Sequence, residues 1–167
     1  MNEPTYNQQK DRNEKNVLKS PSLAEISLKY ESTIALDECP IITSPEEAEK
    51  VLRDIWDEGT IQLREEFVVL LLNNAKRCLG WSRISSGGAT ATIVDPATIF
   101  QVALLSNATS IILAHNHPSG NTDVSKADKT LTKRIKESGK MLGISVEDHL
   151  IITANTYISF REREIIW

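Results

Sequence analysis

Three side chains able to bind a metal lie close together in the stretch that begins at His115. His115 and His117 stand two residues apart at the end of an apolar segment that predicts a strand, so their imidazoles should project from one face. Asp128 follows in the first turn of a predicted helix, after a loop that contains Pro118 and Gly120. Two histidines and one carboxylate form the three-ligand set of a catalytic zinc, which leaves a fourth position for water. The spacing therefore favours one zinc ion per chain.

Ser125 stands three residues before Asp128 and permits two interpretations. A serine before a helix, with an acid in the first turn, is a variant of the capping box. The same hydroxyl and carboxylate also share one helix face, next to the loop that follows the histidines. Taken alone, the pair indicates a helix cap. Together with the in-phase histidines it indicates a functional site as well, and both interpretations can hold at once.

Two neighbouring carboxylates, Glu65 and Glu66, open the apolar segment at residues 65–73. This segment predicts a central strand that is covered on both faces. Side chains alternate along a strand, so the two glutamates should point to opposite faces. Either one could serve as the general base of a hydrolase, and a solvated strand end is the alternative for both.

The elements that must position these residues follow from hydrophobic periodicity and from capping residues. Helices are predicted at residues 45–58, 95–107 and from Ser125 to Gly139 or Gly143, the last with Ala127, Leu131, Ile135 and Ser138 facing the core. Strands are predicted at residues 24–30, 65–73, 78–84, 110–117, 144–153 and 156–163. The class is therefore α/β or α+β, with a mixed β-sheet flanked by helices in three layers. We expect one domain at residues 24–167, after a disordered polar arm at residues 1–20.

Composition limits the classes of partner. A net charge of −4 and a pI near 5.4 argue against a broad basic surface for nucleic acid. Six basic residues do crowd the last predicted helix, where a solvated helix face is the favoured interpretation: Lys126, Lys129, Lys133, Arg134, Lys136 and Lys140. We expect any nucleic-acid binding to be weak. The sequence shows no apolar run long enough for a membrane span and no signal peptide, and Cys39 and Cys78 are expected to be reduced, so we expect a cytoplasmic protein.

The histidine segment resembles a known family. His115-x-His117, seven further residues, Ser125, two more and Asp128 are similar to the JAMM metal motif of JAB/MPN metalloproteases. Within that family, the chain resembles the RadC branch. Four segments carry this likeness: His-Asn-His-Pro-Ser-Gly at residues 115–120, Glu65-x-Phe67, Asp-His-Leu-Ile-Ile at 148–152 and Ser-Phe-Arg-Glu at 159–162. The likeness covers about residues 24–162. The chain departs from the pattern at Val124, where many relatives have proline. We expect a short form without the N-terminal helix-hairpin-helix region of long RadC proteins.

The resemblance implies a three-layer, cytidine-deaminase-like architecture and a zinc-dependent metallopeptidase or isopeptidase that acts on a peptide or protein substrate. It selects Glu65 as the base that takes a proton from the attacking water, and it leaves Glu66 as a surface residue. Ser125 would hydrogen-bond the developing oxyanion. For His149 we favour a purely structural role over the alternative, in which it would orient a metal ligand by a hydrogen bond. The alternative function is a DNA-associated or mobile-element accessory protein that keeps the metal site but has little peptidase turnover.

Overall fold

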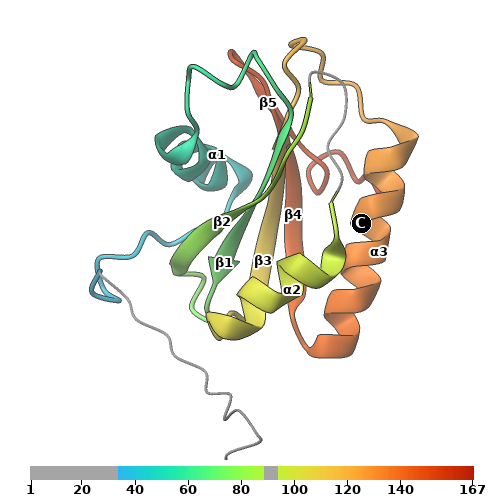
Figure 1. The fold of residues 1–167 in the computed structure, drawn as a ribbon. Coiled ribbons are helices and arrows are strands. Elements are labelled where there is room, and N and C mark those ends of the chain that lie inside the picture. The colour runs from blue at the N-terminus through green and yellow to red at the C-terminus, as the bar shows by residue number, and fades with distance from the viewer. Residues whose placement is uncertain (1–33, 89–93) are drawn as a thin grey trace, which may run out of the picture.

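Three helices and five strands make up the part of the chain that the computed structural model describes, which is residues 34–88 and 94–167 (Figure 1). In chain order the elements are α1 (Pro45–Ile55), β1 (Glu66–Leu72), β2 (Cys78–Ser86), α2 (Pro96–Leu105), β3 (Ser110–Asn116), α3 (Lys126–Leu142), β4 (Ser145–Ile152) and β5 (Tyr157–Ser159). The predicted arm at residues 1–20 and the predicted strand at residues 24–30 lie outside the described residues.

The five strands form one mixed sheet in the order β2-β1-β3-β4-β5. Strands β3 and β4 run parallel, whereas the other three neighbouring pairs are antiparallel. Every residue of β1 and β3 is buried, which confirms the prediction of a central strand at residues 65–73. Phe67 pairs with His115 across these two strands. This register brings the beginning of β1 to the histidine end of β3.

Helices cover both faces of the sheet, so the predicted three-layer α+β fold is confirmed. Helix α1 lies on one face, and α2 and α3 lie on the other (Figure 1). Val68 and Leu70 of β1 pack in the cluster that contains Leu52 of α1. Val69 packs in the opposite cluster with Ile135 of α3. Each such fully buried aliphatic side chain contributes roughly 1.5–3 kcal/mol to the free energy of unfolding. A shift of β1 by one residue would exchange its two faces, so this burial fixes the register of the strand.

Helix α1 is shorter than predicted. Its N-terminus has the expected capping box, in which Ser44 Oγ accepts from Glu47 N–H and the Glu47 carboxylate accepts from Ser44 N–H. The helix was predicted to reach residue 58 but ends at Ile55, because Trp56 leaves helical geometry and buries its ring. Asp57 then accepts a hydrogen bond from Gly59 N–H and forms a turn that the helical periodicity did not indicate.

Strand β5 is also shorter than the predicted segment at residues 156–163, since it ends at Ser159. The reason lies in two side chains that take the backbone donors of the following residues. Arg161 N–H donates to Asp148 Oδ1 at 3.0 Å, and Glu162 N–H donates to Ser159 Oγ at 3.0 Å. A longer β-ladder would need those donors, so the chain turns instead.

Helix α3 begins after Ser125 and ends at Gly143, whose left-handed φ of 71° is typical of a helix C-terminus. Its buried face differs from the predicted one: Thr132, Ile135 and Gly139 are buried, whereas Ala127 is exposed. Gly139 permits this placement, because a Cβ there would lie 2.4 Å from the backbone oxygen of Ile144. The helix row that includes Thr132 therefore faces the sheet.

Two further expectations concern the described part of the chain. Cys39 and Cys78 are buried free thiols, as predicted. Among the described helices, none has both the length and the apolar character that a membrane crossing needs.

Candidate metal centre

The three predicted ligands meet where β3 ends and α3 begins. His115 Nε2 lies 3.0 Å from His117 Nε2 and 3.6 Å from Asp128 Oδ1. One ligand atom from each residue lies within 4.8 Å of the others, and no other group of this kind occurs in residues 34–88 and 94–167. His115 is buried, whereas His117 and Asp128 are half-buried. The structure thus brings together three residues that all lie within the short segment from His115 to Asp128.

The donor set and its spacing fit a divalent metal. Tetrahedral zinc with Zn–N distances of 2.0–2.1 Å places neighbouring ligand atoms about 3.3 Å apart. The two distances from His115 Nε2, 3.0 and 3.6 Å, lie on either side of this separation. Two imidazole nitrogens and a carboxylate oxygen also match the ligands of open, catalytic sites rather than those of closed structural ones.

A helix cap holds the Asp128 carboxylate in place. Asp128 N–H donates to Ser125 Oγ at 3.0 Å, and Ser125 N–H donates in return to Asp128 Oδ2 at 2.9 Å. One carboxylate oxygen therefore completes the cap, while the other, Oδ1, faces His115. The predicted capping box is confirmed, and its geometry leaves the second oxygen for a metal.

A tight loop orients His117. Its Nδ1 lies 2.6 Å from the backbone oxygen of Asn121. A carbonyl oxygen can only accept, so the Nδ1–H of a neutral His117 donates here and Nε2 carries the lone pair. Gly120 closes the loop with a left-handed φ of 78°, and its N–H donates to the His117 carbonyl. The loop therefore turns the Nε2 atom of His117 toward His115.

Burial keeps the His115 ring neutral. Only 2% of its surface is exposed, and the Phe67 ring lies parallel to it. Burial lowers the pKa of His115 to about 4, although the nearby Asp128 carboxylate acts in the opposite direction. Burial also lowers the pKa of His149 well below its usual value, with His115 and His117 adding to the effect. A metal requires neutral imidazole ligands, so the environment of His115 favours metal binding at neutral pH.

Two buried residues behind His115 were not among the predicted site residues. His149 Nε2 lies 2.8 Å from His115 Nδ1, and the Thr132 hydroxyl lies 2.6 Å from His149 Nδ1. Both ring nitrogens of His149 have partners, as a structural histidine requires, and one of these partners is a predicted metal ligand. Thr132 stands four residues after Asp128, and this helical spacing is the signal that could have identified it.

Glu65 lies on the same side of the sheet as the histidines. Its N–H donates to Gly88 O and its carbonyl accepts from Gly87 N–H, so residue 65 continues the pairing of β1 with β2. Phe67 is paired with His115, and alternation along the strand places residue 65 on the face of Phe67. The predicted face of Glu65 is therefore supported by the register.

Glu66 is not the surface residue that was predicted. It is fully buried on the α1 side of the sheet, where Oε1 accepts from Arg64 Nε at 3.1 Å and Oε2 accepts from Thr60 Oγ1 at 3.3 Å. Ser86 Oγ also donates to Oε1, and Arg83 Nε lies 3.5 Å from it. The prediction was wrong because β1 is covered on both faces from its first residue. Paired arginines offset the cost of burying this charge.

Asn116, between the two histidines, connects β3 to the segment that carries Glu65. Its Oδ1 accepts from Glu66 N–H at 2.7 Å, and its Nδ2 donates to the carbonyls of Ile61 and Arg64 at 2.7 and 2.9 Å. The side chain points away from the metal ligands but holds three backbone groups of residues 61–66. Asn116 therefore fixes the position of the Glu65 backbone relative to His115.

We predict that Asn116→Ala lowers the free energy of unfolding by about 2 kcal/mol or more, because each buried backbone group left without a partner costs about 1–3 kcal/mol. The folded variant should still bind zinc, since none of the three ligands is changed. Chemical denaturation and metal titration measure the two effects. Asn155→Ala, in an exposed turn, is the matched control and should change neither. Unchanged stability in Asn116→Ala would contradict the role of this side chain.

Comparison with known proteins places this geometry in a family. Residues 42–165 match the model of the RadC-like JAB domain. A UPF0758 protein of Flavobacterium johnsoniae is 43% identical over 124 residues, which are 74% of this chain and 53% of that protein. A UPF0758 protein of Thermosynechococcus vestitus is 44% identical over 76% of this chain and 50% of its own length. A UPF0758 protein of Desulfitobacterium hafniense is 39% identical over 76% of this chain and 55% of its own length. This chain thus spans about half the length of these relatives. It belongs to the RadC-like JAB domain family, as the histidine motif and the arrangement of its ligands indicate.

Proposed function

We propose that this chain is a zinc-dependent hydrolase that cleaves peptide or isopeptide bonds. One observation carries the proposal: the ligand atoms of His115, His117 and Asp128 converge beside Phe67, which pairs with His115, and strand alternation would put Glu65 on the face of Phe67. Metal ligands and a carboxylate that can act as a base are the two components that metal-assisted hydrolysis requires. Membership of the RadC-like JAB family supports a hydrolase of this kind.

Zinc is the proposed metal because two imidazoles and one carboxylate suit it better than they suit magnesium or calcium, which prefer oxygen ligands. When bound, zinc supplies Lewis acidity that activates water and polarises a carbonyl group. His115, His117 and Asp128 would hold it. The buried free thiols of Cys39 and Cys78 accord with a reducing compartment such as the cytoplasm.

Glu65 and Ser125 have separate proposed roles. Glu65 accepts a proton from the attacking water and later delivers it to the leaving amine. Ser125 Oγ accepts a hydrogen bond from Asp128 N–H, which uses a lone pair and leaves its hydroxyl proton able to donate. That proton is directed to the oxyanion that develops on the substrate. The cap and the proposed catalytic role of Ser125 are therefore compatible.

The proposal is tested by Glu65→Gln, which keeps the shape of the side chain but removes its ability to accept the proton. We expect normal zinc content and a loss of hydrolysis by about 10² to 10⁴, the usual cost of losing a general base. The assay uses zinc-loaded full chain with fluorogenic peptides and isopeptide-linked substrates. Glu58→Gln, at an exposed position before β1, is the neutral control.

Glu66→Gln distinguishes the two neighbouring glutamates. Because Glu66 is buried against arginines on the α1 side, this variant should lose stability but keep its hydrolytic rate per folded molecule. Full activity in Glu65→Gln would remove the proposed base. If the folded Glu66→Gln variant alone loses activity, the general base is Glu66 rather than Glu65.

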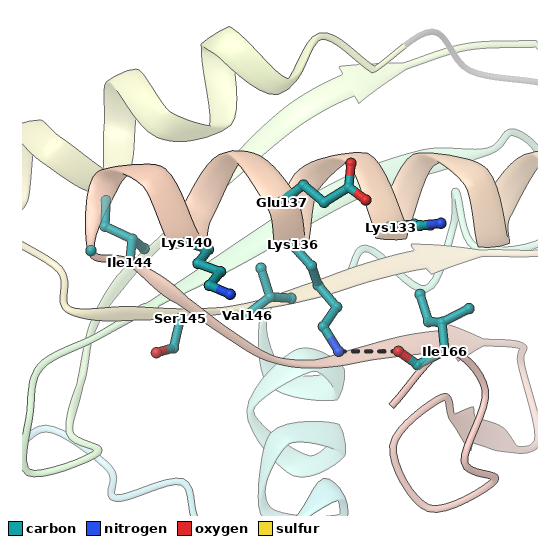
Figure 2. A pocket seen from close by; sticks show the side chains of 9 residues that line it. Lys133, Lys136, Glu137, Lys140, Ile144, Ser145, Val146 and Ile166 are labelled. Carbon is teal, nitrogen blue, oxygen red and sulfur yellow. Dashed lines mark hydrogen bonds between the residues drawn. The ribbon is translucent and has the colours of Figure 1, made fainter.

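A DNA-associated accessory role is the second candidate, and the basic face of α3 is the observation that favours it. Lys133, Lys136 and Lys140 line a hollow of about 560 Å³ between α3 and the beginning of β4 (Figure 2). Lys136 is partly engaged, since its Nζ donates to the Ile166 carbonyl and lies over the Trp167 ring. The other five basic residues of the helix are exposed. This hollow lies at the end of β4 that pairs with Ser110, opposite the histidine end of β3.

We predict that this face binds nucleic acid weakly and through phosphates alone. Affinity for an unrelated DNA duplex should fall steeply as salt rises from 50 to 200 mM, by about 10³-fold or more if six contacts form. Fluorescence anisotropy at several salt concentrations measures this slope. Sequence-selective binding that persists at about 0.2 M salt would favour the accessory role over the hydrolase.

A further inference from the structure

A row of short polar contacts runs from His115 into the core, away from His117. His115 Nδ1 lies 2.8 Å from His149 Nε2, and His149 Nδ1 lies 2.6 Å from Thr132 Oγ1. Thr132 Oγ1 in turn lies 2.6 Å from the backbone oxygen of Asp128. Thr132 and His149 are fully buried. The row therefore joins the ring of one proposed metal ligand to the peptide group of another.

One placement of hydrogens satisfies all three contacts. The Asp128 carbonyl can only accept, so the Thr132 hydroxyl donates its single proton there. Thr132 Oγ1 must then accept from His149, whose Nδ1 carries the hydrogen. A neutral imidazole has one N–H group, so His149 Nε2 accepts from His115 Nδ1–H. His115 Nε2 is left with a lone pair that faces the metal centre.

The neutral state that this placement requires agrees with the surroundings. Burial disfavours a charge on either ring, since His115 is 2% exposed and His149 is fully buried. His117 is oriented in the same sense by Asn121, so two bare Nε2 atoms face each other at 3.0 Å. Asp128 Oδ1 lies 3.6 Å from one of them. Three acceptors with no proton between them form a place that a cation would stabilise.

We propose that Thr132 and His149 are positioning residues that hold His115 in the tautomer whose Nε2 is free to bind a metal. This inference rests on the metal site of the proposed function and adds a role for two residues that touch neither metal nor substrate. A purely structural role would require only their shape, since the His149 ring also packs against Phe160 with centroids 4.6 Å apart. A role in orienting a ligand requires their hydrogen-bonding atoms as well.

The first test compares two substitutions at one position. Thr132→Val keeps the branched shape and removes the hydroxyl, whereas Thr132→Ser keeps the hydroxyl and removes a methyl group. We expect zinc to bind the folded valine variant about 10- to 100-fold more weakly than the parent, which is the usual cost of losing a partner behind a metal ligand. The serine variant should bind close to the parent affinity. Chelator competition measures both, and thermal unfolding records any separate change in stability.

The second test observes the tautomer without metal or substrate. The chain has three histidines, so long-range ¹H–¹⁵N NMR of the metal-free full chain can resolve every ring. We expect His115 to be protonated at Nδ1 in the parent and in Thr132→Ser. This fixed tautomer should be lost in Thr132→Val and in His149→Phe, which keeps an aromatic ring but accepts no hydrogen bond.

Two results would overturn the inference: a His115 proton on Nε2 in the metal-free parent, or zinc binding by folded Thr132→Val as tight as that of the parent. If the valine variant does not fold, the tautomer of the parent decides. Neither measurement uses hydrolysis, so an inactive parent would count against the proposed function and leave this inference testable. A parent that binds no zinc would contradict the metal site, while the NMR result would still report on Thr132 and His149.

Discussion

The convergence of three acceptor atoms at the junction of β3 and α3 is the constraint on which the rest of this structure depends. In the proposed tautomers, His115 Nε2, His117 Nε2 and Asp128 Oδ1 all carry lone pairs and would repel one another without a positive charge between them, yet the two nitrogens lie 3.0 Å apart. Such an arrangement needs rigid supports on every side. The central strand supplies His115, the loop that follows it supplies His117, and the capping box supplies the carboxylate of Asp128.

Local interactions in this region serve the fold and the site together. The Ser125 and Asp128 pair begins α3 and also leaves one carboxylate oxygen facing His115. Asn116 satisfies three backbone groups and also connects the Glu65 segment to the histidine strand. Val124 packs against the apolar cluster of Ile151, Ile158 and Phe160. The loop that leads to α3 is therefore joined to the core by an apolar contact.

The parts of the site that could be predicted from the sequence are those set by local spacing. Two histidines in phase on a strand and an acid in a first helical turn need only the periodicities of 2 and 3.6 to share a face. The same rule predicts the strand at residues 65–73 and the opposite directions of Glu65 and Glu66. It does not predict that Glu66 is buried. Glu66 was placed at the surface because the resemblance gave a role to Glu65 alone. Arg64 is a local partner, two residues away, but Arg83 and Ser86 of β2 are brought to Glu66 only by strand pairing.

Polar residues in the core were the hardest to predict. Thr132 and His149 are 17 positions apart and meet only because α3 packs on β4, an arrangement that requires the close approach of Gly139 to Ile144. The predicted core face of α3 followed apolar residues and therefore missed Thr132. The ends of α1 and β5 were misplaced for a related reason, since Asp57, Asp148 and Ser159 take backbone donors that periodicity assigns to regular structure.

The ligand set is tested most directly by X-ray absorption at the zinc edge on the purified, zinc-loaded full chain. The account predicts one zinc per chain, with two imidazole nitrogens at about 2.0–2.1 Å, further oxygen ligands and no sulfur. Scattering from sulfur, or a first shell without the two imidazoles, would contradict a metal centre built from His115, His117 and Asp128.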